Sequence, residues 1–140
     1  MSSKPETAYY KAIHRQFARV GREPYHEKMN NPYRGGTWDM WYSGGGKNSR
    51  DLWVEYKWLP QLPKRETTMI LPELSQLQLL WGAGRYEEGR HIATILGCPE
   101  GGVIYRDMAW EEELSPSQFR AQMLSKEQIA RYIADWTMPA

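Results

Sequence analysis

Three residues in the first half of the chain have the types and spacing that phosphodiester chemistry needs. Glu55 and Lys57 are separated by one residue in the octet DLWVEYKW (51–58), and Asp39 lies upstream in TWDMWYS. Residues i and i+2 of an extended chain share one face, so Glu55 and Lys57 would lie side by side. Mg²⁺ prefers oxygen ligands and usually takes one or two protein carboxylates, while a lysine can stabilise the charge of a phosphoryl transition state. These residues predict a site where a metal ion and a phosphate meet.

The same octet also has a simpler interpretation. In an extended octet Leu52, Val54, Tyr56 and Trp58 share one face, and the charged residues on the other face could simply be solvated. Glu-x-Lys on its own fits this interpretation, and we expect Asp51 to be a solvated residue at the strand start. Chemistry is favoured by the combination of a Gly-Gly-x-x-Asp approach, a Gly-rich turn and Glu-x-Lys, all following a basic helix.

The spacing of apolar residues predicts the elements that would position these side chains. A helix is expected over 5–20, because an apolar residue recurs every three to four positions, at Tyr9, Ile13, Phe17 and Val20. Next come strands at 25–29, 37–43 and 50–58, the last two joined by the Gly-rich turn 44–49. The remaining elements are a loop at 59–72, a helix at 75–87, strands at 91–97 and 103–107, and helices at 115–123 and 125–136. This order predicts an α/β fold with a mixed sheet and helices on its faces.

Length and composition limit the class of protein. The chain has 140 residues, of which 41% are hydrophobic and 25% charged, which predicts one globular domain over 1–140. We expect no membrane segment, because no apolar run reaches about 18 residues, and the first residues do not resemble a signal peptide. The single cysteine, Cys98, excludes an internal disulfide framework and a cysteine-based zinc site, so a reducing, cytoplasmic setting is expected. His26 and His91 are too isolated to predict metal ligands.

Positive charge is concentrated in the first part of the chain. Residues 1–50 contain nine Lys or Arg against four Asp or Glu, whereas residues 71–140 contain six against ten. Basic side chains in or beside the segments that lead to the predicted site would bind phosphates without reading base sequence. The residues expected to do so are Lys11, Arg15, Arg19, Lys28, Arg34, Lys47, Lys64 and Arg65.

On these motifs the chain resembles the PD-(D/E)XK nuclease superfamily, and within it the small phage and VRR-type nucleases related to Holliday-junction resolvases. Asp39, after a Gly-rich approach, matches the motif aspartate, and Glu55 to Lys57 match its E-x-K. SQLQLLW matches the Ser/Thr-x-x-Gln-x-x-Trp pattern of the following helix through Ser75, Gln78 and Trp81. One position departs from the pattern, since Trp38 stands where a proline usually precedes the aspartate.

The resemblance implies a restriction-endonuclease-like αβββαβ core over about 6–106, with a C-terminal helical extension over about 107–140. It implies a DNA endonuclease that uses Mg²⁺, with Mn²⁺ as a substitute, and selects branched, nicked or flapped DNA. Asp39 and Glu55 would hold the metal, with Glu6 or Glu27 as a further ligand, and Lys57 and Gln78 would assist catalysis. Gln78 has an equally good structural interpretation, because Ser75 and Gln78 can form a capping box at a helix start.

The source, partners and activity have further expectations. By analogy with junction-cutting relatives, a homodimer and DNA are the expected partners. A phage gene is the expected source, which would place the protein in the host cytoplasm. The alternative function is a non-catalytic phage factor that binds DNA or a host protein on the same fold, and an RNA-directed nuclease is a weaker third hypothesis.

Overall fold

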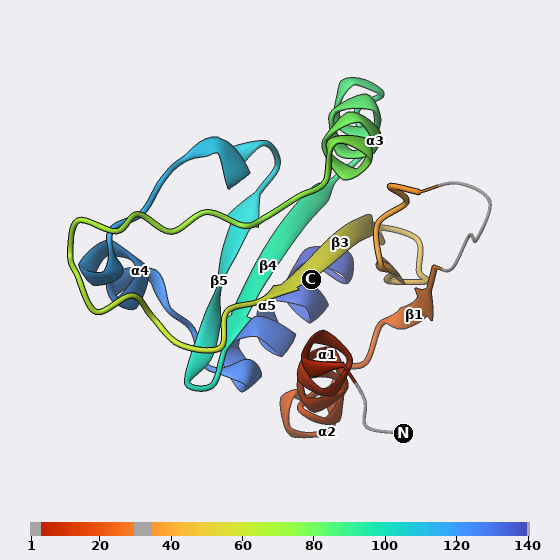
Figure 1. The fold of residues 1–140 in the computed structure, drawn as a ribbon. Helices are drawn as coiled ribbons and strands as arrows, with labels where there is room; N and C mark the ends of the chain where they lie inside the picture. Colours follow the sequence, from red (N-terminus) through yellow and green to blue (C-terminus); the bar gives the residue numbers. More distant parts are fainter. Residues whose placement is uncertain (1–3, 30–34, 140) are drawn as a thin grey trace.

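A five-stranded mixed sheet forms the centre of the computed structural model, which describes residues 4–29 and 35–139 (Figure 1). The strands follow the order of the sequence, and β3 and β4 pair in parallel while the other neighbours pair antiparallel. Their bounds are β1 (Tyr25–Lys28), β2 (Met40–Ser43), β3 (Asp51–Trp58), β4 (Ile92–Cys98) and β5 (Gly101–Arg106). The mixed sheet predicted from the sequence is therefore confirmed.

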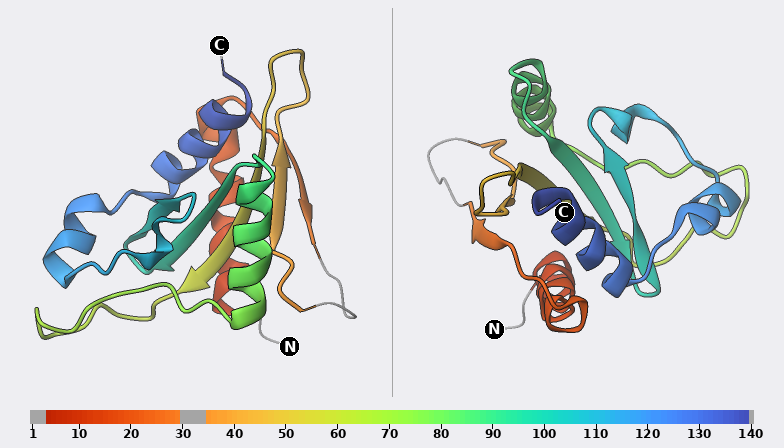
Figure 2. Two further views of the ribbon diagram at one scale, coloured as in Figure 1. Left: turned by 90° about the horizontal axis from the view of Figure 1, so that it is seen from above. Right: turned by 180° about the vertical axis from the view of Figure 1, so that it is seen from behind.

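Helices cover both faces of this sheet (Figure 2). One face packs against α1 (Pro5–Arg15), α2 (Phe17–Val20) and α5 (Lys126–Thr137). The other face meets α3 (Gln76–Glu87), the short 3-10 helix η1 (Ala109–Glu111) and α4 (Pro116–Gln122). Within the described ranges, no helix combines the length and the apolar character needed to cross a membrane.

Side chains of β3 point alternately to the two faces of the sheet, so one face of the strand is apolar and the other includes charged residues. Leu52, Val54 and Tyr56 are buried against α1 and α5, as the sequence pattern predicts. The opposite face of β3 presents Trp53, Glu55 and Lys57 toward α3 and the loop before it. α5 belongs to the main core, because Ile129 and Ile133 are fully buried in the same cluster as the β3 residues. The C-terminal residues therefore support the sheet that holds Glu55, rather than forming a separate layer beyond it.

Several element bounds differ from those predicted. The helix expected over 5–20 is interrupted at Gln16 and continues as α2, which is followed by the cap residue Gly21 with a left-handed φ of 81°. The strand expected over 37–43 begins only at Met40, so Asp39 lies directly before it rather than within it. β5 begins at Gly101 rather than at 103, because the glycines there allow a close backbone approach to Leu124 instead of forming the predicted turn.

Candidate metal and phosphate site

Asp39 and Glu55 are brought together by the pairing of β2 and β3. Met40 pairs with Val54 in this antiparallel ladder, and one further step in the same register brings Asp39 opposite Glu55. The backbone N–H of Tyr56 donates to Oδ2 of Asp39 at 3.4 Å, which fixes the Asp39 side chain against β3. Two carboxylates that are 16 residues apart in sequence therefore share one site, as the sequence predicts.

Glu55 is a buried carboxylate with two partners on one oxygen. Its side chain is only 3% exposed. Its Oε2 atom accepts from the Gln78 amide at 3.2 Å and lies 3.7 Å from the ammonium of Lys57. Its Oε1 atom is buried and has no hydrogen-bond partner within the described part of the chain. One carboxylate oxygen is thus available to a ligand, while the other is held in position.

The electrostatics of the site disfavour two ionised carboxylates in the absence of a cation. Burial and the neighbouring Asp39 carboxylate raise the pKa of Glu55 to about 9, and Lys57 only partly opposes this shift. A divalent cation bound between the two carboxylates would reverse the effect, because it stabilises the charged form of both. The described residues contain no cluster of three or more His, Cys, Asp or Glu side chains that could hold a metal. Two carboxylates and a buried unbonded oxygen nevertheless fit Mg²⁺, which completes its coordination with water and phosphate oxygens.

Gln78 is positioned by the start of α3. The Ser75 hydroxyl accepts from the Gln78 N–H at 3.1 Å, and the Gln78 side-chain carbonyl accepts from the Ser75 N–H at 2.9 Å. This is the predicted capping box. The side-chain NH₂ group of Gln78 takes no part in it and donates to Glu55 instead. The helix cap and the contact with the site therefore use different atoms of one side chain.

Trp38 links the same helix to the approach of Asp39. Its ring is fully buried, and its indole N–H donates to the backbone carbonyl of Gln78 at 3.0 Å. The ring also packs beside Trp81 and Trp110, with centroids 5.9 and 5.6 Å away. Trp38 thus connects the approach of Asp39 to Gln78 through one rigid side chain.

A cavity of about 220 Å³ opens beside the two carboxylates. Its lining includes three lysines and three carboxylates, a mixture that suits a metal ion together with a phosphate. The residues that line it are Lys4, Glu6, Thr7, Tyr10, Lys28, Asp39, Glu55, Tyr56, Lys57 and Gln78. All four residues expected to take part in catalysis lie here.

The same cavity distinguishes the two glutamates that were expected to compete for a role as metal ligand. Glu6, in the first turn of α1, lines it, whereas Glu27 on β1 lies outside and accepts from the Tyr25 hydroxyl at 3.3 Å. Sequence reasoning missed Thr7, Tyr10 and Lys4 as cavity residues. Helical spacing is a signal that could have found the first two, since Thr7 and Tyr10 lie three residues apart on the face of α1 that includes Glu6.

The predicted phosphate-binding residues do not all gather at this cavity. Only Lys28 lines it, while Lys11, Arg15 and Arg19 are exposed along α1 and α2, and Lys64 and Arg65 are exposed in the loop after β3. Lys47 lies in the connection between β2 and β3, just before the start of β3, whereas Lys57 is near the other end of that strand. Arg34 lies outside the described residues. Besides Lys28 and Lys57, the cavity is lined by Lys4, which is the N-cap residue of α1.

The histidines His14, His26 and His91 pack against other rings, and the cysteine is buried. His91 packs edge-to-face against Trp136 with ring centroids 4.8 Å apart, and the ring of His26 lies 4.1 Å from that of His14. Cys98 is buried in the cluster that α4 covers. Asp51 is exposed at the start of β3, as predicted, and does not line the cavity.

Comparison with known proteins gives a likeness in structure only. The chain matches no family model and no curated protein. Among solved structures, it is similar to Hjc, a Holliday junction resolvase of the archaeal hyperthermophile Archaeoglobus fulgidus, with a TM-score of 0.56 and 13% sequence identity. The match covers 89% of this chain and 98% of the resolvase. The α/β fold with its five-stranded sheet is therefore the fold of that resolvase, as the sequence motifs predicted.

Proposed function

We propose that this protein is a metal-dependent endonuclease that hydrolyses phosphodiester bonds of DNA and selects branched, nicked or flapped structures. One observation supports this function most directly: Asp39, Glu55 and Lys57 line a single cavity whose other charged groups include Lys4 and Lys28. The similarity of the fold to a Holliday junction resolvase supports the choice of DNA and of branched structures.

Each residue of the cavity has a distinct part in this proposal. Asp39 and Glu55 would hold Mg²⁺ or Mn²⁺, and the bound ion would supply polarisation of the phosphate and a lower pKa for a coordinated water. Gln78 keeps Glu55 oriented through the 3.2 Å hydrogen bond to Oε2. The ammonium of Lys57, which enters the cavity from the same strand, stabilises the charge that develops on the phosphoryl oxygens.

Selection by DNA structure fits the distribution of basic residues. The exposed basic side chains come from α1, α2, β1 and the loop after β3, and they can bind phosphates on several strands without reading bases. A four-way junction has two symmetric strands to cut, so we propose that two copies of the chain act together on it. Light scattering on the purified protein tests this, and a monomer both free and on junction DNA would contradict it. Origin from a phage gene stays a prediction.

The decisive experiment is a cleavage panel with matched variants. Supercoiled, linear, nicked, forked and four-way DNA, together with a forked RNA, are incubated with Mg²⁺ or Mn²⁺. We expect forked or four-way DNA to be cut fastest, and Glu55→Ala and Lys57→Ala to slow cleavage by about 100-fold or more. Asp51→Ala, on the same face of β3 but outside the cavity, is the control and should cut like the wild type.

Two results would reject the proposal. One is that the wild type cuts none of these DNAs, and the other is that Glu55→Ala cuts as fast as the wild type. Calorimetry then distinguishes the nuclease from the alternative, a non-catalytic binding protein. Such a protein would show no binding of Mg²⁺ or Mn²⁺ that is lost when Asp39 or Glu55 is substituted. Faster cleavage of the forked RNA would instead assign the enzyme to RNA.

A further inference from the structure

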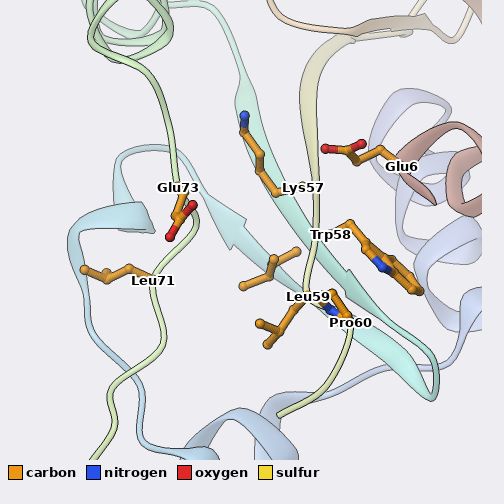
Figure 3. A pocket seen from close by; sticks show the side chains of 8 residues that line it. Glu6, Lys57, Trp58, Leu59, Pro60, Leu71 and Glu73 are labelled. Atoms are coloured by element: carbon orange, nitrogen blue, oxygen red, sulfur yellow. The ribbon is translucent and has the colours of Figure 1, made fainter. Parts of the chain in front are cut away.

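A second cavity, of about 330 Å³, adjoins the proposed catalytic cavity (Figure 3). Lys57 and Glu6 line both cavities, so the two form neighbouring compartments of one cleft. The volume lies at the lower end of the range found for pockets that bind small molecules, about 300–1,000 Å³. A group attached to a phosphate in the catalytic cavity could therefore extend into this second compartment.

Five of the eight described residues that line the second compartment have apolar side chains, and the other three, Glu6, Lys57 and Glu73, are charged. Residues at the end of β3 and just after it, Trp58 to Pro60, line it together with Leu96 of β4, which is buried. The opposite wall comes from the loop that precedes α3, through Leu71 and Glu73. Ile70 anchors this loop, because its N–H and carbonyl both pair with Leu114 at 2.7 and 3.1 Å. The wall that contains Leu71 and Glu73 is thus tied to the rest of the fold.

Two carboxylates, those of Glu6 and Glu73, line the second compartment. Figure 3 shows the carboxylates of Glu6 and Glu73 on either side of Lys57. These charges would repel a second phosphate in this compartment. A flat, uncharged group with apolar faces and N–H donors at its edge complements the lining, since it can contact the apolar residues and donate to a carboxylate.

We propose that this compartment binds an unpaired nucleobase of the DNA, next to the phosphate that is cut, and that Glu73 accepts a hydrogen bond from the amino group of the base. This inference rests on the proposed function, because it identifies which part of the DNA the cleft receives. Carboxylate side chains recognise the amino group of cytosine, whereas thymine has no amino group to offer. A base in a duplex is stacked and paired, so a base must be unpaired to enter. The compartment therefore supplies a physical reason for selecting forks and flaps over continuous duplex.

The test measures binding, so that it does not depend on cleavage. Forked DNAs with identical duplexes and four-nucleotide arms made of cytosine, thymine or abasic sites are titrated with protein in EDTA, and fluorescence anisotropy gives each dissociation constant. We expect abasic arms to bind at least as weakly as thymine arms, about tenfold or more below cytosine arms, because they lose the contacts of the base together with its amino group. Thymine arms should bind about tenfold more weakly than cytosine arms, because one hydrogen bond to a charged acceptor is lost.

Variants at exposed positions connect this preference to the compartment. Glu73→Gln should remove most of the difference between cytosine and thymine, because the amide can also donate to thymine carbonyls. Glu87→Gln, an exposed glutamate at the end of α3 outside the compartment, should keep the preference. Equal binding of all three arms, or a cytosine preference that survives Glu73→Gln, would overturn the base pocket.

Cleavage of the same DNAs with Mg²⁺ separates this inference from the proposed function. Cutting of forked DNA without any dependence on the arm bases leaves the nuclease in place and removes the base pocket. A cytosine preference that depends on Glu73, with no cutting of any DNA, keeps the pocket and rejects the nuclease.

Discussion

The amide of Gln78 contacts Glu55 and the start of its own helix at the same time. Its N–H group donates to Glu55 Oε2 at 3.2 Å, and its carbonyl oxygen accepts from the Ser75 N–H at 2.9 Å. An amide has both donors and acceptors, so one side chain can serve both purposes. The capping interpretation and the site interpretation of Gln78 are therefore compatible, and α3 cannot shift without disturbing the buried carboxylate.

We predict that Gln78→Ala weakens both metal binding and cleavage, while an identical cap elsewhere does not matter. Gln128 closes the capping box of α5 with the same geometry, at 2.8 and 3.1 Å to Ser125, but it lies outside the cavity. Each substitution should lower the free energy of unfolding by about 1 kcal/mol or less through the cap. Only Gln78→Ala should reduce Mg²⁺ affinity measured by calorimetry, by about tenfold.

Equal metal affinity in the two variants would mean that Gln78 is only a capping residue. A third variant, Gln78→Glu, refines the comparison, because glutamate retains the capping acceptor but cannot donate to an ionised Glu55. We expect thermal unfolding without metal to show lower stability than in the wild type, because a third carboxylate then lies beside Asp39 and Glu55 while the capping acceptor is kept.

The arrangement of the strands could be predicted from local patterns because those patterns have strict periods. The alternation over 51–58 assigned Leu52, Val54 and Tyr56 to the buried face, and the structure confirms it. The break at Gln16 and the early start of β5 could not be predicted in this way. The early start of β5 depends on a distant segment, because Gly102 pairs with Leu124, and no local period encodes that contact.

The candidate site also contains residues that local patterns could predict and residues that they could not. Glu55 and Lys57 lie on one face of one strand, and Asp39 could be placed by assuming a hairpin register. The role of Trp38 could not be found from sequence, because its hydrogen bond to the Gln78 carbonyl spans 40 residues. The choice between Glu6 and Glu27 likewise needed the position of α1 against β3, which depends on packing.

We predict that Trp38→Phe loosens the site although the aromatic ring is retained. Phenylalanine has no indole N–H, so the part-buried carbonyl of Gln78 loses this 3.0 Å donor, at a cost of about 1–3 kcal/mol in unfolding free energy. Cleavage of forked DNA should fall about tenfold or more, since α3 is less firmly held against Asp39.

Trp41→Phe is the matched control for this change. The Trp41 indole nitrogen is buried and has no hydrogen-bond partner within the described part of the chain, so its removal breaks no bond. We expect unfolding by denaturant to differ by less than about 1 kcal/mol from wild type. Equal destabilisation in the two variants would show that packing, rather than the hydrogen bond to Gln78, explains the effect.

We predict that the metal-free protein becomes less stable as the pH rises from about 5 to 9, and that Mg²⁺ removes much of this loss. Burial and Asp39 raise the pKa of Glu55 from its ordinary 4.5 to about 9, against the opposing charge of Lys57. Between these values the folded protein holds a proton that the unfolded chain releases, so the free energy of unfolding falls with rising pH. Chemical denaturation at several pH values, in EDTA and in Mg²⁺, measures both effects.

Glu55→Gln provides the control, because an amide does not titrate. Its metal-free stability should vary less over this pH range than that of the wild type, and Mg²⁺ should stabilise it less. The wild type in EDTA could instead be equally stable at pH 5 and pH 9, with the same dependence of stability on pH in Glu55→Gln. That result would mean that Glu55 does not have a raised pKa beside Asp39 in solution.

We predict that Lys28 contributes to DNA binding as a phosphate contact, whereas Lys47 does not. Lys28 is on β1 and lines the cavity beside Glu55, while Lys47 lies at the far end of β3. Removal of one phosphate contact reduces the slope of log affinity against log salt concentration by about 1 and weakens binding similarly for all sequences. Anisotropy titrations of forked DNA over a range of salt concentrations, in EDTA, should therefore give a lower slope for Lys28→Ala and an unchanged slope for Lys47→Ala. The opposite order would place the DNA along the β2–β3 connection, away from the two carboxylates, and would be incompatible with cleavage in this cavity.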